Sequence, residues 1–196
     1  MKKFISKRNN VYFKDGMVFK ELQSKEAAEQ EAEFLCLLKS KAVMVPDVIS
    51  VIGNLLCLEY IGGDTLPEFM AEQNNITRCD AVAENIAEWF VSFYNAVDHN
   101  TTSEIRGDVN GRNFLVINGK IVGIDFEEHI FGKKETDLGR ILAYIATYNY
   151  EDSSIQKKME ENLFYSFVRN FSISEEVLNA EKQKELSMIN KRRKQI

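Results

Sequence analysis

The chain has 196 residues, a net charge of -5, 44% hydrophobic residues and 28% charged residues. This length suffices for one domain or two small lobes, and the composition is that of an ordinary globular protein. The acidic balance argues against a general nucleic-acid binder, and no stretch approaches the roughly 18 apolar residues of a membrane span. The basic start MKKFISKRNN lacks the apolar run of a signal peptide.

The cysteines point to a reducing compartment. Cys36, Cys57 and Cys79 are scattered and lack the spacing of a zinc site or a redox pair. We therefore expect a cytoplasmic protein. Cys36 and Cys57 lie in apolar stretches, which predicts buried thiols with a packing role.

The first part of the chain predicts a β-rich lobe. Asp15-Gly16 is a strong hairpin signal, because both residue types accept the backbone of a tight turn. Strands are expected at residues 11–14, 17–22, 48–52 and 55–61, with a helix at 24–39 between the two pairs.

The chain becomes helical after Gly62-Gly63. Thr65-Leu66-Pro67-Glu68 has the form of a capping box with proline in the first turn. This order predicts an α+β protein with two lobes, residues 1–61 and 62–196, and a ligand cleft between them. Helices are expected at about 77–99, 136–148, 153–170 and 174–193, with a hairpin at 114–124 and an aromatic core of Trp89, Phe90, Phe93 and Tyr94.

The stretch RGDVNGRNFLVINGKIVGIDFEE carries the chemistry. Its two apolar strands join at Asn118-Gly119, so Asn113 and Asp125 fall at one open end of the hairpin, and the loop with Asp108 leads to the same end. Amide and carboxylate oxygens suit Mg²⁺, which substrate phosphates usually complete. A third acid nearby can orient and deprotonate a hydroxyl.

Asp-x-x-x-x-Asn followed by a hairpin ending in Ile-Asp-Phe resembles the catalytic loop and metal motif of protein kinases. GDVNGRNFLV with GIDFEE looks closest to the aminoglycoside phosphotransferase and choline kinase branch of the protein-kinase-like superfamily, and the likeness runs from Val11 to about Tyr148. It implies a two-lobed kinase-like fold, ATP and Mg²⁺ as cofactors, and phosphate transfer to a hydroxyl acceptor.

A lysine and a glutamate in the first lobe offer an independent test of this resemblance. The kinase-like fold needs a strand lysine that a helix glutamate holds, and Lys20 lies on the strand expected at 17–22. At about 100° per residue, Glu31 lies in the middle of an apolar stripe, while Glu26, Glu29 and Glu33 point away. An acid in that position needs a buried cation, and Lys20 is the natural candidate.

The resemblance also implies roles for individual residues. Lys20 would contact the α- and β-phosphates with Glu31 as its ion-pair partner. Glu59, Tyr60 and Ile61 would form the hinge that binds adenine through backbone groups. The remaining implied roles are catalytic base for Asp108, Mg²⁺ ligand for Asn113 and Asp125, and structural brace of the catalytic loop for Asp137.

Departures from the family pattern leave two alternatives open. SKRNNVYF stands where a glycine-rich loop would precede Val11, and Arg106 replaces the usual histidine, which favours a nucleotide-binding module without transfer. The short helical lobe and the basic end INKRRKQI also resemble compact atypical kinases of the Rio type, which would act with a macromolecule. Nucleic acid would meet the chain only through this basic tail, which is otherwise expected to be a solvated end.

Overall fold

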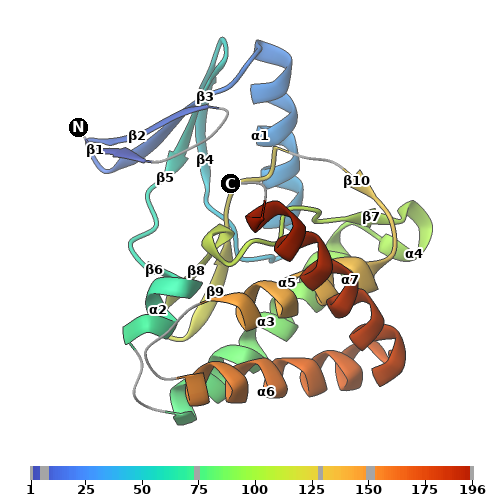
Figure 1. Ribbon diagram of the computed structural model, residues 1–196. Helices are drawn as coiled ribbons and strands as arrows, with labels where there is room; N and C mark the ends of the chain where they lie inside the picture. Colours follow the sequence, from blue (N-terminus) through green and yellow to red (C-terminus); the bar gives the residue numbers. More distant parts are fainter. Residues whose placement is uncertain (1, 5–8, 73–75, 128–129, 149–152, 195–196) are drawn as a thin grey trace.

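The computed structural model describes residues 2–4, 9–72, 76–127, 130–148 and 153–194. Two lobes are visible in Figure 1: a five-stranded antiparallel sheet with one helix, and a helical lobe that carries a three-stranded sheet and a two-stranded sheet. The predicted α+β, two-lobed architecture is confirmed.

The sheet of the first lobe has the strand order β1-β2-β3-β5-β4. β2 (Asn10–Lys14) and β3 (Met17–Glu21) form the predicted hairpin, and Asp15 and Gly16 at its turn have φ of 51° and 79°. β3 also pairs with β5, which places Lys20 opposite Leu56 in the middle of the sheet. The other strands are β1 (Lys2–Phe4), β4 (Val48–Ile52) and β5 (Leu55–Glu59).

Helix α1 (Lys25–Ser40) packs against β4 and β5. Ser24 caps it by accepting a hydrogen bond from the Ala27 N–H at 3.2 Å. Cys36 is on the exposed face, so its prediction as a buried thiol is wrong, whereas Cys57 is buried in β5. The predicted stripe is buried except for Ala27, which is partly exposed, and Ala32 joins it: the buried residues are Ala28, Glu31, Ala32, Phe34, Leu35 and Leu38.

The chain enters the second lobe after β5. β6 (Asp64–Thr65) pairs with β8 (Phe114–Ile117) of that lobe, and α2 (Leu66–Glu72) follows. Glu68 makes the return bond of the predicted capping box: its Oε2 accepts the Thr65 N–H at 2.9 Å, and it also accepts the Thr65 hydroxyl at 2.6 Å. The division at residues 61 and 62 stays a prediction.

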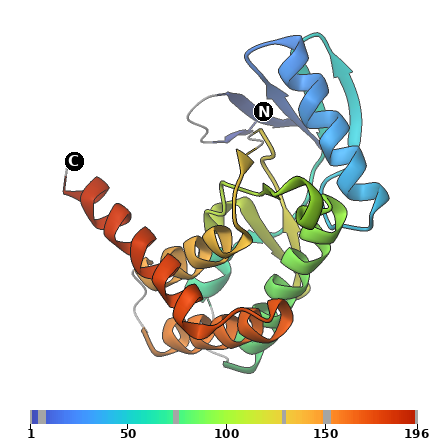
Figure 2. The same ribbon diagram turned by 90° about the vertical axis from the view of Figure 1, so that its right-hand side faces the viewer.

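Four long helices build the second lobe. α3 (Ile76–Ala96) packs against α6 (Ser153–Phe171), and α5 (Lys134–Thr147) packs against α7 (Glu175–Arg193), as Figure 2 shows from the side. The aromatic side chains of α3 are buried as predicted. A short helix, α4 (His99–Thr102), follows α3. None of the described helices is long and apolar enough to cross a membrane.

The second hairpin joins the two lobes. β8 and β9 (Lys120–Gly123) pair around Asn118-Gly119 as predicted. The Gly123 N–H donates to Met44 O (3.0 Å), and the Trp89 indole N–H donates to the same oxygen (2.9 Å). A Cβ on Gly123 would lie 2.3 Å from the Trp89 ring, so only glycine fits this contact. Strand β7 (Glu104–Ile105) and the turn η1 (Gly111–Asn113) precede the hairpin. Strand β10 (Ile130–Phe131) follows it and pairs with β7.

Candidate functional site

Lys20 and Glu31 form the ion pair that the sequence predicts. Lys20 Nζ lies 2.9 Å from Glu31 Oε1, and the two side chains are 5% and 2% exposed. The same glutamate oxygen accepts the backbone N–H of Phe126 at 3.1 Å. Glu31 therefore connects α1, the central strand of the sheet and the segment after β9, so its position fixes three parts of the site at once.

Asp125 lies against the same ammonium group. Its Oδ1 is 2.6 Å from Lys20 Nζ, and its side chain is 43% exposed. The residue has φ of 66°, a left-handed conformation that aspartate tolerates better than most residues and that turns the chain sharply after β9. Burial raises the pKa of Asp125, but the Lys20 charge and hydrogen bond outweigh this and hold the pKa below its usual value.

Glu127 is a third carboxylate on Lys20 that sequence reasoning left out of the site. Its Oε1 lies 2.6 Å from Lys20 Nζ, and it also accepts a hydrogen bond from the Asn9 amide. Burial raises the pKa of Glu127, Lys20 opposes this shift, and the neighbouring Asp125 charge raises the pKa further. The signal in the sequence was a pair of acids, Asp125 and Glu127, two residues apart directly after the hairpin. Both side chains contact Lys20 in the structure.

The three carboxylates determine the charge of the lysine. Burial lowers the pKa of Lys20, but Glu31, Asp125 and Glu127 together raise it above its usual value. Lys20 is therefore a protonated ammonium group at neutral pH.

The catalytic loop is held by Asp137, which lies on α5 and is fully buried. Its carboxylate accepts the N–H groups of Arg106 (2.6 Å) and Gly107 (3.1 Å) and the Tyr94 hydroxyl (3.0 Å). Three donors to one carboxylate fix the backbone immediately before Asp108. Asp137 therefore occupies the bracing position that the resemblance implies.

Arg106 connects the catalytic loop to the metal motif. Its guanidinium donates to Ile124 O and lies 4.0 Å from the centre of the Phe126 ring, and the side chain is almost completely buried. Burial lowers the pKa of this guanidinium, and the surrounding acids, Asp125 first, counteract the shift. Arg106 therefore links the loop before Asp108 to the segment that carries Asp125.

Asp108 and Asn113 lie at the open end of the hairpin. Asp108 is exposed, its Oδ1 accepts the Asn110 N–H (3.2 Å), and its backbone oxygen accepts the Asn113 amide (3.3 Å). The Ile124 N–H donates to Asn113 O at 2.9 Å, which joins the start of β8 to the residue before Asp125. These bonds hold the segments that carry Asp108, Asn113 and Asp125 together, and the convergence of the three side chains stays a prediction.

The expected hinge follows β5 directly. Glu59 lies opposite Met17, whereas Lys20 lies opposite Leu56, so about 10 Å of strand separates the hinge from the lysine. Tyr60 is 42% exposed, and its ring centre lies 4.5 Å from that of Phe13. This spacing suits a nucleotide with its base at residues 59–61 and its phosphates at Lys20; the hinge role itself stays a prediction.

A family model for the RIO domain matches residues 4–139, more than half of the chain. The chain belongs to the RIO domain family. The matched region contains all the candidate site residues, from Lys20 to Asp137. The second resemblance seen in the sequence, to compact Rio-type kinases, is therefore shown for the family.

Solved structures agree with this fold. Similar structures include aminoglycoside phosphotransferase APH(2'')-Ib bound to ADP (TM-score 0.64, 12% identity, 94% of this chain and 80% of that chain). An aminoglycoside-3'-phosphotransferase of type VIII gives a TM-score of 0.63 at 13% identity, with 92% and 91% of the two chains covered. Amicoumacin kinase hAmiN, solved with AMP-PNP, gives a TM-score of 0.59 at 11% identity, with 85% of this chain and 71% of that chain covered. No curated protein matches the sequence.

The RIO domain match and these structures confirm that the chain is protein-kinase-like. They also bear out the two resemblances seen in the sequence, to Rio-type kinases and to aminoglycoside phosphotransferases. At such low identities, the structures show only the shared fold. Helices α6 and α7 lie outside the RIO domain match.

Proposed function

We propose that this RIO domain protein is an ATP- and Mg²⁺-dependent phosphotransferase that moves the γ-phosphate of ATP to a hydroxyl group. Family and fold support ATP-dependent phosphotransfer in general terms. The observation that carries the proposal is the contact of one ammonium group with both Glu31, 11 residues away on α1, and Asp125, 105 residues away after β9. An acceptor is identified neither by the fold nor by the family.

In this proposal, catalysis rests on positioning and charge. Lys20 binds the α- and β-phosphates, and Glu31 keeps it in place. Asp108 orients the acceptor hydroxyl and takes its proton, and its exposure allows a substrate to reach it. Residues 59–61 bind the base through backbone groups.

The residues at the open end of the hairpin fit a divalent metal ion. Asp125 offers a partly exposed carboxylate, and Asn113 is anchored through its amide nitrogen, so its amide oxygen serves as the ligand atom. Hard oxygen donors of this kind suit Mg²⁺, which would neutralise charge on the transferred phosphoryl group. Both side chains belong to segments that the Ile124–Asn113 hydrogen bond holds together.

Asp108→Asn tests the proposal. We expect phosphate transfer to fall by at least about 10², because a general base contributes this much, while calorimetry still shows MgATP binding. Asp15→Asn in the exposed β2–β3 turn is the matched control, since Asn-Gly forms the same turn. Unchanged turnover in Asp108→Asn would remove the assignment. Binding of ATP by the wild-type chain without transfer to any of a panel of hydroxyl compounds would instead indicate a nucleotide-binding module.

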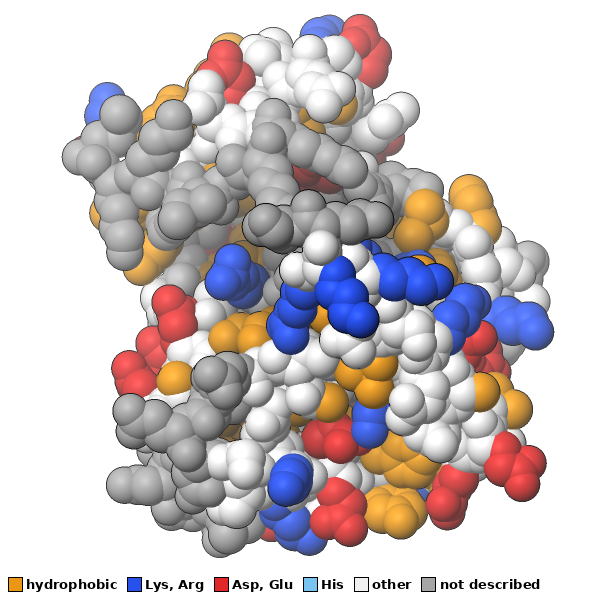
Figure 3. Space-filling model, viewed as in Figure 1, with side chains coloured by type: hydrophobic (Ala, Val, Ile, Leu, Met, Phe, Trp, Pro, Cys, Tyr) orange, Lys and Arg blue, Asp and Glu red, His pale blue; other side chains and the backbone are white. Residues whose placement is uncertain are grey.

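A second candidate function, kinase or ATPase activity with a macromolecular partner, is favoured by the end of α7. This end is part of a folded helix whose last side chains are exposed to solvent, as expected: Arg192 lies 2.6 Å from Glu185, and Arg193 donates to Thr147 O at 3.2 Å. Figure 3 shows basic side chains gathered on this face where α7 ends. Glu185 contacts both Arg192 (2.6 Å) and Arg140 (3.6 Å), and Arg140 donates to Gly107 O at 3.1 Å, so the basic end lies near the catalytic loop.

Substituting Lys191, Arg193 and Lys194 with glutamine separates these two functions. Arg192 is kept because it pairs with Glu185. A small-molecule kinase should retain its turnover. A kinase that acts with a polyanionic partner should bind that partner more weakly, and the binding should depend less on salt concentration. Lys184→Gln, an exposed change on the same helix, is the control.

A further inference from the structure

Lys20 is enclosed by acids in the state described: it donates hydrogen bonds to Glu31 and Asp125, and Glu127 lies in ion-pair contact. An ammonium group carries three N–H donors. Three carboxylate oxygens surround it, at 2.9 Å (Glu31), 2.6 Å (Asp125) and 2.6 Å (Glu127). A phosphate oxygen can therefore reach Lys20 only if one of these carboxylates gives up its place.

We propose that Glu127 competes with nucleotide phosphates for Lys20, and that this competition makes nucleotide binding depend on a divalent metal ion. The inference rests on the proposed function, in which Lys20 binds phosphate. It adds a residue to the site and a form of control: without metal, Glu127 keeps the lysine occupied.

Burial identifies which carboxylates can be exchanged. Glu31 is 2% exposed and also accepts the Phe126 N–H, so releasing Lys20 would leave a buried charge and weaken a second contact. Glu127 and Asp125 are 19% and 43% exposed, so water can replace the lysine around them. These two acids are therefore the exchangeable partners, and Glu31 is the permanent one.

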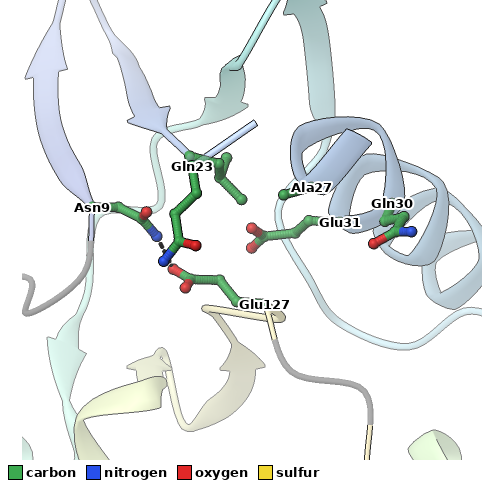
Figure 4. Close-up of a pocket in the computed structure, with 7 residues that line it drawn as sticks. Asn9, Gln23, Ala27, Gln30, Glu31 and Glu127 are labelled. Atoms are coloured by element: carbon green, nitrogen blue, oxygen red, sulfur yellow. Dashed lines mark hydrogen bonds between the residues drawn. The ribbon is translucent and has the colours of Figure 1, made fainter. Parts of the chain in front are cut away.

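A cavity beside Glu127 gives its side chain room to move. The cavity has a volume of about 180 Å³ and opens between the start of the sheet, α1 and the segment after β9. Figure 4 shows the carboxylates of Glu31 and Glu127 directed into this space. Glu31 Oε2 is buried there without a partner among the described residues, so the cavity has a polar wall. Its other lining residues are Asn9, Leu22, Gln23, Ala27 and Gln30.

The charge balance explains why a metal would relieve the competition. Three carboxylates face one ammonium group, so the cluster carries excess negative charge before a triphosphate arrives. Metal-free ATP would add to this repulsion and would also have to displace Glu127 from Lys20. With a divalent cation bound, Asp125 and Glu127 have a second positive group to face, and Lys20 regains donors for phosphate oxygens.

The experiment measures ATP binding by calorimetry in EDTA and in Mg²⁺, for wild type, Glu127→Gln and Glu127→Ala. Both variants remove the charge at residue 127, and glutamine keeps its size. We expect metal-free ATP to bind about tenfold more tightly to both variants, a modest part of the interaction of two unit charges near a protein surface. Glu33→Gln is the matched control, because it removes one acid from the exposed face of α1.

The metal-free affinities decide the outcome. Equal or weaker metal-free binding in both Glu127 variants, with thermal unfolding showing intact folds, would overturn the proposal. An equal gain in Glu33→Gln would also overturn it, because the effect would then come from net charge and not from Lys20. If wild type fails to bind MgATP at all, the proposed function is itself wrong, and this inference falls with it.

Discussion

Glu31 in α1 and Glu185 in α7 are two nearly buried acids that support the site from different lobes. Their side chains are 2% and 4% exposed. Glu31 holds Lys20, and Glu185 lies 3.6 Å from Arg140, which in turn donates to Gly107 O of the catalytic loop at 3.1 Å. Both acids therefore position a cation that acts at the site.

The two acids differ in the surroundings of their partners. Lys20 is 5% exposed and faces three carboxylates, so both members of this pair are removed from water. Arg192, the closest partner of Glu185, is 58% exposed, and it can exchange its ion pair for water at little cost. Equal burial of the two acids thus does not imply equal dependence on their partners.

The largest effect is expected when the buried pair is broken. Lys20→Met should lower the free energy of unfolding by about 3 kcal/mol, because it leaves Glu31 buried and unpaired. For a chain of this length, this corresponds to a fall in Tm of roughly 10 °C by calorimetry.

The double variant Lys20→Met with Glu31→Leu sharpens this test. Removing both charges should restore much of the lost stability, although nucleotide binding stays absent. A double variant no more stable than Lys20→Met alone would mean that the pair is not the source of the loss.

A smaller effect is expected at the other acid. Glu185→Gln should cost about 1 kcal/mol, or roughly 3 °C in Tm, because Arg192 turns to solvent and glutamine keeps the shape of the side chain. Equal losses of stability in Glu185→Gln and Lys20→Met would contradict the distinction between the two pairs. Glu181→Gln on the same helix provides the reference, since its partner Lys184 is 63% exposed.

The same contrast explains what the sequence predicts and what it does not. Glu31 could be recognised because α1 has a clear apolar stripe, and an acid within that stripe requires a partner. The helical wheel would also have corrected the error at Cys36, which lies about 140° from Glu31 at 100° per residue. Glu185 gave no such signal, because the apolar and polar residues of α7 are not clearly segregated and its burial comes from packing against α5.

The hairpins were predictable because their turns are local. Asp15-Gly16 and Asn118-Gly119 adopt the positive φ values that their residue types favour, and the registers follow from the turns. The Arg106 side chain bonds Ile124 O, 18 residues further along the chain, and the approach of Glu127 to Lys20 joins segments about a hundred residues apart. No local pattern encodes such contacts, so only the residue types could be recognised from the sequence.

The smallest expected effect concerns acid pH and the exchangeable partner Asp125. Its pKa is lower in the folded chain than its ordinary value of 3.8, because Lys20 outweighs burial. Its contribution to stability is therefore present above pH 3.8 and is lost as the pH falls through the folded-state pKa. Asp125→Asn should be less stable than wild type by under about 1 kcal/mol at pH 6, since the side chain is 43% exposed, and this difference should shrink as the pH falls below 3.8. Urea unfolding at several pH values measures it, with Asp15→Asn as the control, and a difference that grows on acidification would contradict the assigned direction.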